Sequence, residues 1–257
     1  MIDIHSHIIF GVDDGAKTIE NSIEMILEAY EAGFTDIIAT PHYMESAYEV
    51  SKSKIKEKMD IITEILNTNN VEINIHQGNE IYITNNIVEL INKNLASSLN
   101  NSKYVLFETP MNVEPLNLLD VIYSLLENKK IPIIAHPERY EYIQKNPNKL
   151  IELIETGVLF QANYGSVIGQ YGKETQKTVV ELLQNNMIHF MGTDTHRPNS
   201  VYTRLPSAIK ELRKILPEYI VEEITTENAK RIIDNEDIEI RQPKGIKQGI
   251  FSKFLKK

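Results

Sequence analysis

Short apolar runs alternate with amphipathic helical patterns along most of the chain. The apolar runs predict seven strands, at residues 2–7, 35–40, 71–76, 103–108, 131–136, 158–163 and 188–192. Strands that alternate with helices pair in parallel through right-handed crossover connections. The pattern therefore predicts an α/β fold built around a parallel sheet.

Apolar residues recur at helical spacing between these strands. The clearest helix carries Ile19, Ile23, Ile26 and Leu27 on one face and stops at Gly33, a residue suited to a helix C-terminus. Further helical patterns cover residues 55–66, 116–126, 147–157 and a segment around 179–183. Residues 206–235 predict two helices, because Pro217 interrupts the first one.

Polar residues suited to metal binding stand at or just beyond the carboxyl ends of the predicted strands. They are His7, His42, Glu80, Glu108, His136 and Asp194, with Asn163 at the remaining strand end. In βα barrels these ends share one face, where the active site lies. The rhythm favours a distorted TIM-like (β/α)7 barrel with a metal site on that face. A dinucleotide-binding fold is disfavoured, since no glycine-rich phosphate loop follows the first strand.

Composition limits the class of protein. The 257 residues suffice for one large α/β domain, which we place at residues 1–240, followed by a basic tail at 241–257. The absence of cysteine excludes thiolate metal sites and a cysteine nucleophile, and the net charge of −9 argues against nucleic-acid binding. With no apolar run of about 20 residues and no signal-peptide pattern, we expect a cytoplasmic protein.

The tail differs in charge from the rest of the chain. Residues 241–257 contain six lysines or arginines and no acid, with apolar residues at helical spacing among them: Ile246, Ile250, Phe251, Phe254 and Leu255. Such a segment could lie on an anionic lipid surface or contact a membrane-bound kinase. Docking of the tail onto its own barrel is the simpler alternative.

The candidate ligands have the geometry and chemistry of a polynuclear metal site. His5 and His7 lie two residues apart on a strand, so both side chains point to one face, and Asp194 and His196 repeat this spacing. Carboxylates gathered on that face would repel each other unless cations neutralised them. Imidazole mixed with carboxylate suits Mn²⁺, Fe²⁺ or Zn²⁺. Taken singly, the histidine pair could be structural, and Asp14 could belong to an ordinary turn.

Arg139 follows His136 by three residues and is a candidate to bind an anion beside the metals. The alternative is a surface ion pair with Glu138 or Glu141. His76 and His189 lie inside predicted strands, so we interpret them as core or supporting residues.

The ordered motifs resemble those of the polymerase-and-histidinol-phosphatase (PHP) superfamily. They are His-x-His, Thr-Pro-His, Gly-x-Glu, Phe-Glu-Thr-Pro, Ala-His-Pro-Glu-Arg and Gly-Thr-Asp-x-His. The segments Met-Ile-Asp-Ile-His-Ser-His and Gly-Val-Asp-Asp-Gly-Ala-Lys-Thr are similar to one branch, the bacterial CpsB/CapC-type tyrosine phosphatases of capsule and exopolysaccharide loci. Asp14 and Glu108 stand where many PHP proteins carry a histidine, which favours this branch.

The resemblance implies three divalent ions, with manganese preferred and iron or zinc left open. His5, His7, Glu80 and Asp194 would hold the first ion, and Asp14, His42 and His196 the second. Glu108 and His136 would hold the third, with Glu80 bridging. Six positive charges against four carboxylates leave two, which matches a phosphomonoester dianion. Arg139 would bind the phosphate, and either Arg204, which we prefer, or Arg197 would be a second arginine.

The resemblance also implies a reaction and a substrate. Hydroxide generated at the metals would attack phosphorus in line, releasing phosphate from phosphotyrosine on the tail of the cognate bacterial tyrosine kinase. The enzyme would thereby regulate capsular or exopolysaccharide synthesis. Two alternatives stay open: a small-molecule phosphoesterase such as a histidinol-phosphate phosphatase, and a non-catalytic regulatory barrel.

Overall fold

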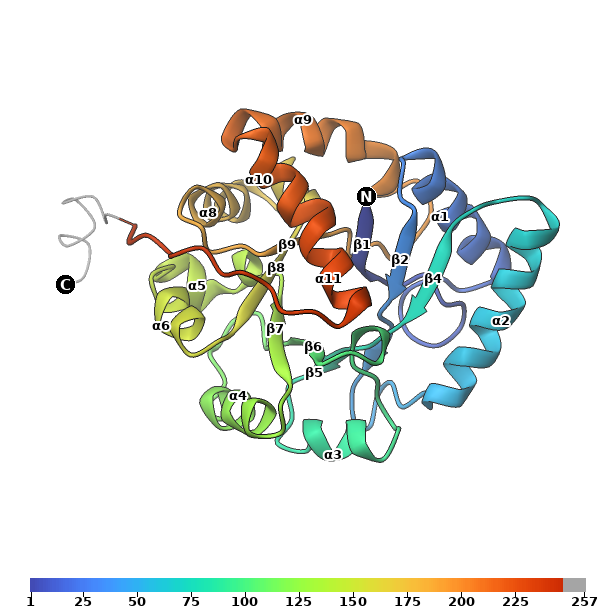
Figure 1. Cartoon of the computed structure of the whole chain (residues 1–257), viewed down its shortest axis with the longest axis horizontal. Coiled ribbons are helices and arrows are strands. Elements are labelled where there is room, and N and C mark those ends of the chain that lie inside the picture. The colour runs from blue at the N-terminus through green and yellow to red at the C-terminus, as the bar shows by residue number, and fades with distance from the viewer. Residues whose placement is uncertain (247–257) are drawn as a thin grey trace.

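The computed structural model describes residues 1–246, in which short parallel strands form two sheets. The first sheet holds β1 (Ile2–Ser6), β2 (Asp36–Ala39) and β4 (Asn74–Gln77), in the order β1-β2-β4. The second runs β3 (His42–Tyr43), β5 (Glu80–Tyr82), β6 (Tyr104–Glu108), β7 (Ile131–Ala135), β8 (Leu159–Asn163) and β9 (Phe190–Gly192). Figure 1 shows the strands at the centre of the molecule with helices around them.

The two sheets form a curled, half-barrel surface. Chain continuity joins them on one side, where β2 pairs with β4 and the following β3 pairs with β5. On the other side β1 meets β9, because Asp194 N donates to His5 O at 2.8 Å and His7 N donates to Thr195 O at 3.0 Å. Residues of the first strand are thereby brought beside those of the last.

Each predicted strand range overlaps an observed strand, but β3 and β5 were not predicted. The prediction of seven strands was therefore incomplete in number. Pro41, which lacks a backbone N–H, separates β2 from β3, and Gly78 separates β4 from β5. His42 and Glu80 begin these two extra strands and stand opposite each other in register. The two candidate ligands His42 and Glu80 thus lie on the short strands β3 and β5, each separated from the preceding strand by a break.

The helices cover the outside of the curled sheet. They are α1 (Ile19–Glu31), α2 (Lys52–Thr68), α3 (Ile87–Asn92), α4 (Leu118–Glu127), α5 (Glu141–Lys145), α6 (Lys149–Glu155), α7 (Tyr164–Val167), α8 (Lys173–Gln184), α9 (Leu205–Ile215), α10 (Glu218–Glu222) and α11 (Asn228–Asp234). Pro217 separates α9 from α10 as predicted, and the π-helical turn η4 (Glu223–Glu227) joins α10 to α11. Three short 3₁₀ turns are η1 (Leu99–Asn101), η2 (Pro137–Arg139) and η3 (Tyr202–Arg204). None of the helices within residues 1–246 has both the length and the apolar character to cross a bilayer.

Within residues 1–246 the protein has two apolar cores, and the smaller one lies on the inner side of the curled sheet. Ile4, Tyr104 and Leu106 from the strands pack there with Ala229 and Ile232 of α11. Figure 1 shows α11 crossing in front of the strands, and Asn235 at its end accepts a hydrogen bond from Lys103 N at the start of β6. Because α11 covers the amino ends of strands, the carboxyl ends are left for the site.

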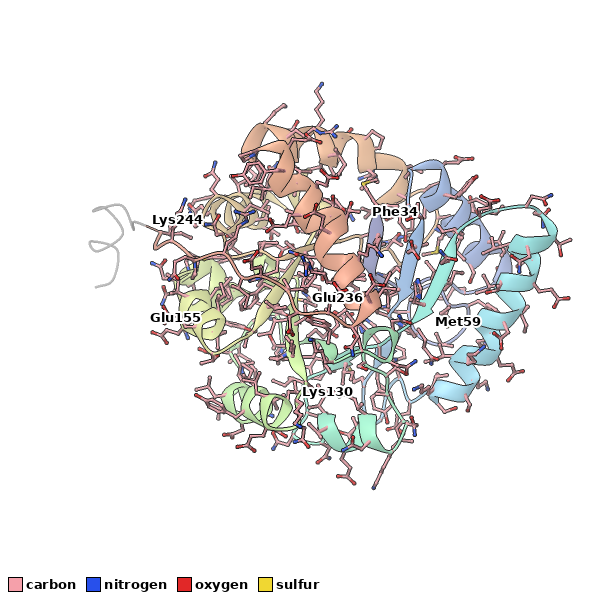
Figure 2. The ribbon with its side chains drawn as sticks, viewed as in Figure 1. Phe34, Met59, Lys130, Glu155, Glu236 and Lys244 are labelled. Carbon is pink, nitrogen blue, oxygen red and sulfur yellow. The ribbon has the colours of Figure 1, made fainter. Side chains whose placement is uncertain are left out.

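The chain after α11 packs against the protein itself. Arg241 forms an ion pair with Glu223, Lys244 N donates to Asn185 O at 2.9 Å, and Ile246 N donates to Asn148 Oδ1 at 2.8 Å. In Figure 2, Glu236 lies near the end of α11 and Lys244 near the last described residues. Residues 241–246 are not helical. The remainder of the predicted amphipathic segment, 247–257, lies outside the described residues.

Candidate metal centre

The nine predicted ligands converge at the carboxyl ends of the strands. They come from β1 (His5) and the residues after it (His7, Asp14), from β3 (His42), β5 (Glu80) and β6 (Glu108), and from segments that follow β7 (His136) and β9 (Asp194, His196). Six of them are buried, whereas His42 and His196 are partly exposed and Asp14 is exposed. The site thus has a buried floor and an open side.

One group contains the four residues predicted for the first ion. His5 Nε2 lies 3.1 Å from Glu80 Oε2 and 3.5 Å from Asp194 Oδ1. His7 Nε2 lies 3.3 Å and 3.5 Å from the same two oxygens. Ligand atoms of these four residues all lie within 4.8 Å of one another. Two imidazoles and two carboxylates therefore surround one point.

A second group lies toward the open side. Asp14 Oδ1 is 3.6 Å from His42 Nε2 and 3.4 Å from His196 Nε2. The ring of His7 stacks on that of His196, with centroids 3.9 Å apart, so His7 completes a group of four. The structure thus brings together the three residues predicted for a second ion and adds His7 to them.

The third predicted group has a different composition in the structure. Glu108 Oε1 lies 3.4 Å from His42 Nδ1, and Glu80 Oε2 lies 3.1 Å from the same nitrogen, so His42, Glu80 and Glu108 form a compact set. His136 Nε2 is 3.0 Å from Glu80 Oε1 but 3.9 Å from Glu108 Oε2. Glu80 belongs both to this set and to the first group, so it lies at the centre of the cluster. His136 contacts Glu80 more closely than its expected partner, Glu108.

Two candidate ligands have an unusual backbone conformation. His136 has φ +34° and Asp194 has φ +52°, both in the left-handed region that residues with a Cβ seldom adopt. Such conformations concentrate at functional sites, where the surrounding structure offsets their strain. Gly192 allows the close approach of β9, since a Cβ there would lie 2.9 Å from His5 Cβ. The backbone at His136 and Asp194 therefore departs from regular strand geometry where it forms the cluster, and Gly192 leaves room for His5.

Further buried polar groups orient the imidazoles. Asp13 Oδ2 lies 2.7 Å from His7 Nδ1, and Gln161 Oε1 lies 2.7 Å from His5 Nδ1. In both rings the Nδ1 partner leaves Nε2 directed at the cluster, the arrangement typical of metal-binding histidines. Neither Asp13 nor Gln161 was predicted to have this role. Only the fold places Gln161 beside His5, although Asp13 was visible as an acid next to Asp14.

The cluster requires positive charge. Burial, reinforced by the charges of Glu80 and Asp194, raises the pKa of Glu108 to about 9. Burial lowers the pKa of His5, but the carboxylates of Glu80 and Asp194 outweigh it and raise that pKa to about 9. The buried atoms Glu80 Oε2 and His42 Nδ1 make no hydrogen bond. Divalent cations would satisfy these atoms and neutralise the carboxylates without added protons, so the donor set fits metal ions.

A cavity of about 510 Å³ opens beside Asp14, Asp194 and His196. Its cationic lining residues are Lys17, Arg139 and Arg197. Arg139 Nη1 donates to Asp194 Oδ2 at 2.7 Å, and its guanidinium lies 4.6 Å from the centre of the Tyr171 ring. The alternative partners Glu138 and Glu141 are therefore not its ion-pair partners here.

The two candidates for a second arginine occupy different places. Arg197 lines the cavity and is exposed. Arg204 ends η3, is exposed, and is not part of the cavity lining. Sequence spacing alone did not show which of these two arginines lines the cavity. The structure therefore favours Arg197 over our preferred Arg204.

The two remaining histidines lie apart from the cluster. His76 Nε2 contacts Asp36 Oδ1 at 2.9 Å on the neighbouring strand. His189 is buried, and its Nδ1 accepts a hydrogen bond from Phe160 N at 3.1 Å. His76 lies within β4, as predicted, whereas His189 immediately precedes β9 rather than lying inside it, and neither belongs to the ligand groups.

Fold and site together define a candidate polynuclear metal protein. The chain belongs to the CpsB/CapC family of capsular polysaccharide synthesis, whose model matches residues 1–234. It is 35% identical to CapC of Staphylococcus aureus over 246 residues, which cover 95% of both chains. It is 33% identical over 252 residues to the tyrosine-protein phosphatase YwqE of Bacillus subtilis (strain 168), covering 96% of this chain and 97% of YwqE.

A solved structure gives a similar match. It comes from a study of YwqE from Bacillus subtilis and CpsB from Streptococcus pneumoniae, described as unique metal-dependent tyrosine phosphatases. The TM-score is 0.91 at 33% sequence identity, and the match covers 96% of this chain and all of the other. The agreement therefore extends over nearly the whole chain and includes the strands that carry the cluster.

Proposed function

We propose that this protein is a metal-dependent protein-tyrosine phosphatase. The observation that carries the proposal is the position of the ligand cluster against a cavity lined by Lys17, Arg139 and Arg197. A phosphate group there would meet both metal ions and guanidinium groups, the combination that stabilises a transferring phosphoryl group. The names of relatives that match nearly the full chain support the same activity.

The proposed metal content is three divalent ions, with manganese preferred over iron and zinc. His5, His7, Glu80 and Asp194 would hold the first, and Asp14, His42 and His196 the second. Glu108 and His136 would hold the third, sharing Glu80. When bound, such ions lower the pKa of water toward neutrality and offset charge on phosphate oxygens. Their six charges exceed those of the four carboxylates by two, which suits a phosphate dianion.

The protein's own residues would bind and orient the substrate. Arg139 is held by Asp194 and by the ring of Tyr171, so its guanidinium is positioned before phosphate arrives. Arg197 would supply a second guanidinium from the cavity wall. The phenolate leaving group has a conjugate-acid pKa near 10, so it needs less protonation than an alkoxide. Phosphotyrosine therefore suits a site with no dedicated general acid assigned.

The proposed substrate is the phosphorylated tail of a bacterial tyrosine kinase involved in capsule or exopolysaccharide synthesis. Membership of a capsule-synthesis family supports a partner of this kind. The division into a catalytic domain at 1–240 and an interaction segment at 241–257 also stays a prediction. Contacts of residues 241–246 with the protein itself favour self-docking for the first part of that segment.

We also propose that the two sheets are one distorted barrel with seven strand positions. The interrupted pairs β2/β3 and β4/β5 would each count as one position. The hydrogen bonds of His5 O and His7 N with the residues after β9 would close the barrel. Hydrogen exchange tests this, because a closed seam should protect the amides of His7 and Asp194 as strongly as those of central strands.

A direct comparison of substrates tests the function. Purified protein with added manganese should hydrolyse a phosphotyrosine peptide much faster than histidinol phosphate, and elemental analysis should find bound transition metal. Asp194→Asn removes a central carboxylate charge and should abolish activity. Faster hydrolysis of histidinol phosphate would favour the small-molecule alternative. A protein that binds no metal and stays inactive with manganese would support the non-catalytic alternative.

A further inference from the structure

The end of β8 carries two buried amide side chains among elements that carry histidines and carboxylates. Gln161 and Asn163 are both fully buried and lie between His5 and Asp194. Gln161 Oε1 lies 2.7 Å from His5 Nδ1, and Gln161 Nε2 donates to Asn163 Oδ1 at 2.9 Å. Asn163 Nδ2 then donates to Asp194 Oδ2 at 2.7 Å. Two amides thus join two candidate metal ligands.

The carboxylate of Asp194 determines which group donates and which accepts in each hydrogen bond of this chain. An ionised Asp194 only accepts hydrogen bonds, so Asn163 must present its Nδ2 to it. Asn163 Oδ1 is then left for Gln161, which must donate with Nε2. Gln161 Oε1 is left in turn for His5, whose Nδ1 must carry the proton. His5 Nε2 consequently keeps its lone pair directed at the cluster.

The same carboxylate oxygen holds the anion-binding arginine. Asp194 Oδ2 accepts from Arg139 Nη1 at 2.7 Å as well as from Asn163, while Oδ1 faces His5 and His7. The orientation of Asp194 therefore depends on Asn163 on one side and Arg139 on the other. A change in the amides would alter both the carboxylate and the guanidinium that it holds.

The backbone of Asn163 is anchored from the loop that carries Arg139. Glu138 Oε1 accepts hydrogen bonds from Asn163 N at 2.9 Å and from Ser166 Oγ at 2.6 Å. Glu138 is itself fully buried, and it lies between His136 and Arg139 in the chain. Two routes thus connect β8 to Arg139. One runs from the Asn163 side chain through Asp194, and the other runs from Asn163 N to Glu138, the residue before Arg139.

We propose that Gln161 and Asn163 are positioning residues that couple the metal ligand His5 to the phosphate-binding Arg139. The inference rests on the proposed metal centre, and it predicts that a change at Gln161, which contacts neither Arg139 nor the cavity, weakens phosphate binding. A local role of Gln161 would affect only the binding of metal through His5.

The experiment measures two binding constants on full-length protein by isothermal titration calorimetry. The first is that of Mn²⁺ for the metal-free protein, and the second is that of inorganic phosphate at saturating manganese. The variants are Gln161→Leu, Asn163→Leu and Gln161→Glu. Thr178→Val is the control, because Thr178 is also buried and polar but lies on α8 and bonds to Glu174 O.

Gln161→Leu should weaken Mn²⁺ binding by about tenfold to a hundredfold, as expected for a partner of a ligating histidine. It should also weaken phosphate binding by about tenfold, the effect of losing one hydrogen bond to a charged group. Gln161→Glu still accepts from His5 but cannot donate to Asn163. It should keep Mn²⁺ affinity near wild type and still weaken phosphate binding. Thr178→Val should change neither constant.

Phosphate affinity within twofold of wild type in both Gln161 variants would overturn the coupling. Wild-type protein that binds no phosphate with manganese present would also overturn it, because Arg139 would then not bind the anion. Circular dichroism checks folding. Gln161→Glu preserves size and polarity, so its phosphate affinity decides the question if the leucine variants do not fold. Failure of the phosphatase assay with wild-type protein would contradict the proposed function without changing these two binding measurements.

Discussion

Arg139 donates a hydrogen bond to Asp194 Oδ2 at 2.7 Å, which links the cationic lining of the cavity to a central carboxylate of the candidate ligand cluster. The pair spans the segments that follow β7 and β9, and Asp194 takes part from a left-handed backbone conformation. An arginine bound in this way has lost much of its side-chain freedom before substrate arrives, so less entropy is lost when phosphate binds.

Replacement of Arg139 should therefore impair catalysis more than metal binding. Arg139→Ala should lower kcat/KM for a phosphotyrosine peptide by about a hundredfold to a thousandfold, the effect of removing one preorganised donor to developing charge. Manganese content by elemental analysis should stay near wild type, because Asn163 still donates to Asp194. Arg139→Lys is the matched control and should recover part of the loss through its charge. Equal kinetics in wild type and Arg139→Ala would contradict the assignment.

Removal of metal should destabilise the protein as well as inactivate it. Glu80 and Glu108 are buried among other charged groups, so loss of cations leaves repulsion that only protons relieve. Manganese at about a hundred times its dissociation constant should stabilise the fold by about 2.7 kcal/mol. Differential scanning calorimetry should show a Tm that rises with manganese concentration. Glu80→Gln should reduce the increment, and a Tm independent of manganese would contradict the metal centre.

Much of the strand pattern and of the ligand set could be predicted because both are local in sequence. Apolar runs located the strands, and residues at their ends were the ones that a parallel sheet gathers. The extra strands at His42 and Glu80 escaped prediction because they are only two and three residues long and begin after the predicted strand ends at residues 40 and 76. Gln161 escaped because a buried glutamine within a strand has no signature until the fold places His5 beside it.

The arginines also show that contacts between segments distant in sequence could not be predicted from the local pattern. Arg139 follows His136 closely, so its position could be predicted from the motif alone. Arg197 and Arg204 are separated by a loop whose path depends on Asn199, which contacts Glu28 and Glu24 of α1. Those contacts join segments far apart in sequence, and spacing could not choose between the two arginines.

The cavity lining distinguishes these arginines experimentally. Arg197→Ala should raise KM for a phosphotyrosine peptide by about threefold to tenfold, as expected for an exposed, charge-assisted contact. Arg204→Ala removes the same charge from a position outside the lining and should stay within about twofold of wild type. Steady-state kinetics at low ionic strength gives the comparison. A larger effect from Arg204→Ala would restore our sequence-based preference.

Burial of His189 predicts how stability depends on pH. Burial lowers the pKa of His189 to about 4, below the value of about 6.5 expected in the unfolded chain. The unfolded state therefore binds the proton more readily, and stability is lost as pH falls from about 6.5 toward 4. At pH 5 this histidine should lower the free energy of unfolding by about 2 kcal/mol relative to pH 8.

The variant His189→Asn tests this, because asparagine offers an oxygen to Phe160 N and does not titrate in this pH range. Urea unfolding at both pH values should show the variant losing about 2 kcal/mol less than wild type, since all other residues are the same in both proteins. The same loss in wild type and variant would show that His189 does not resist protonation in the folded state.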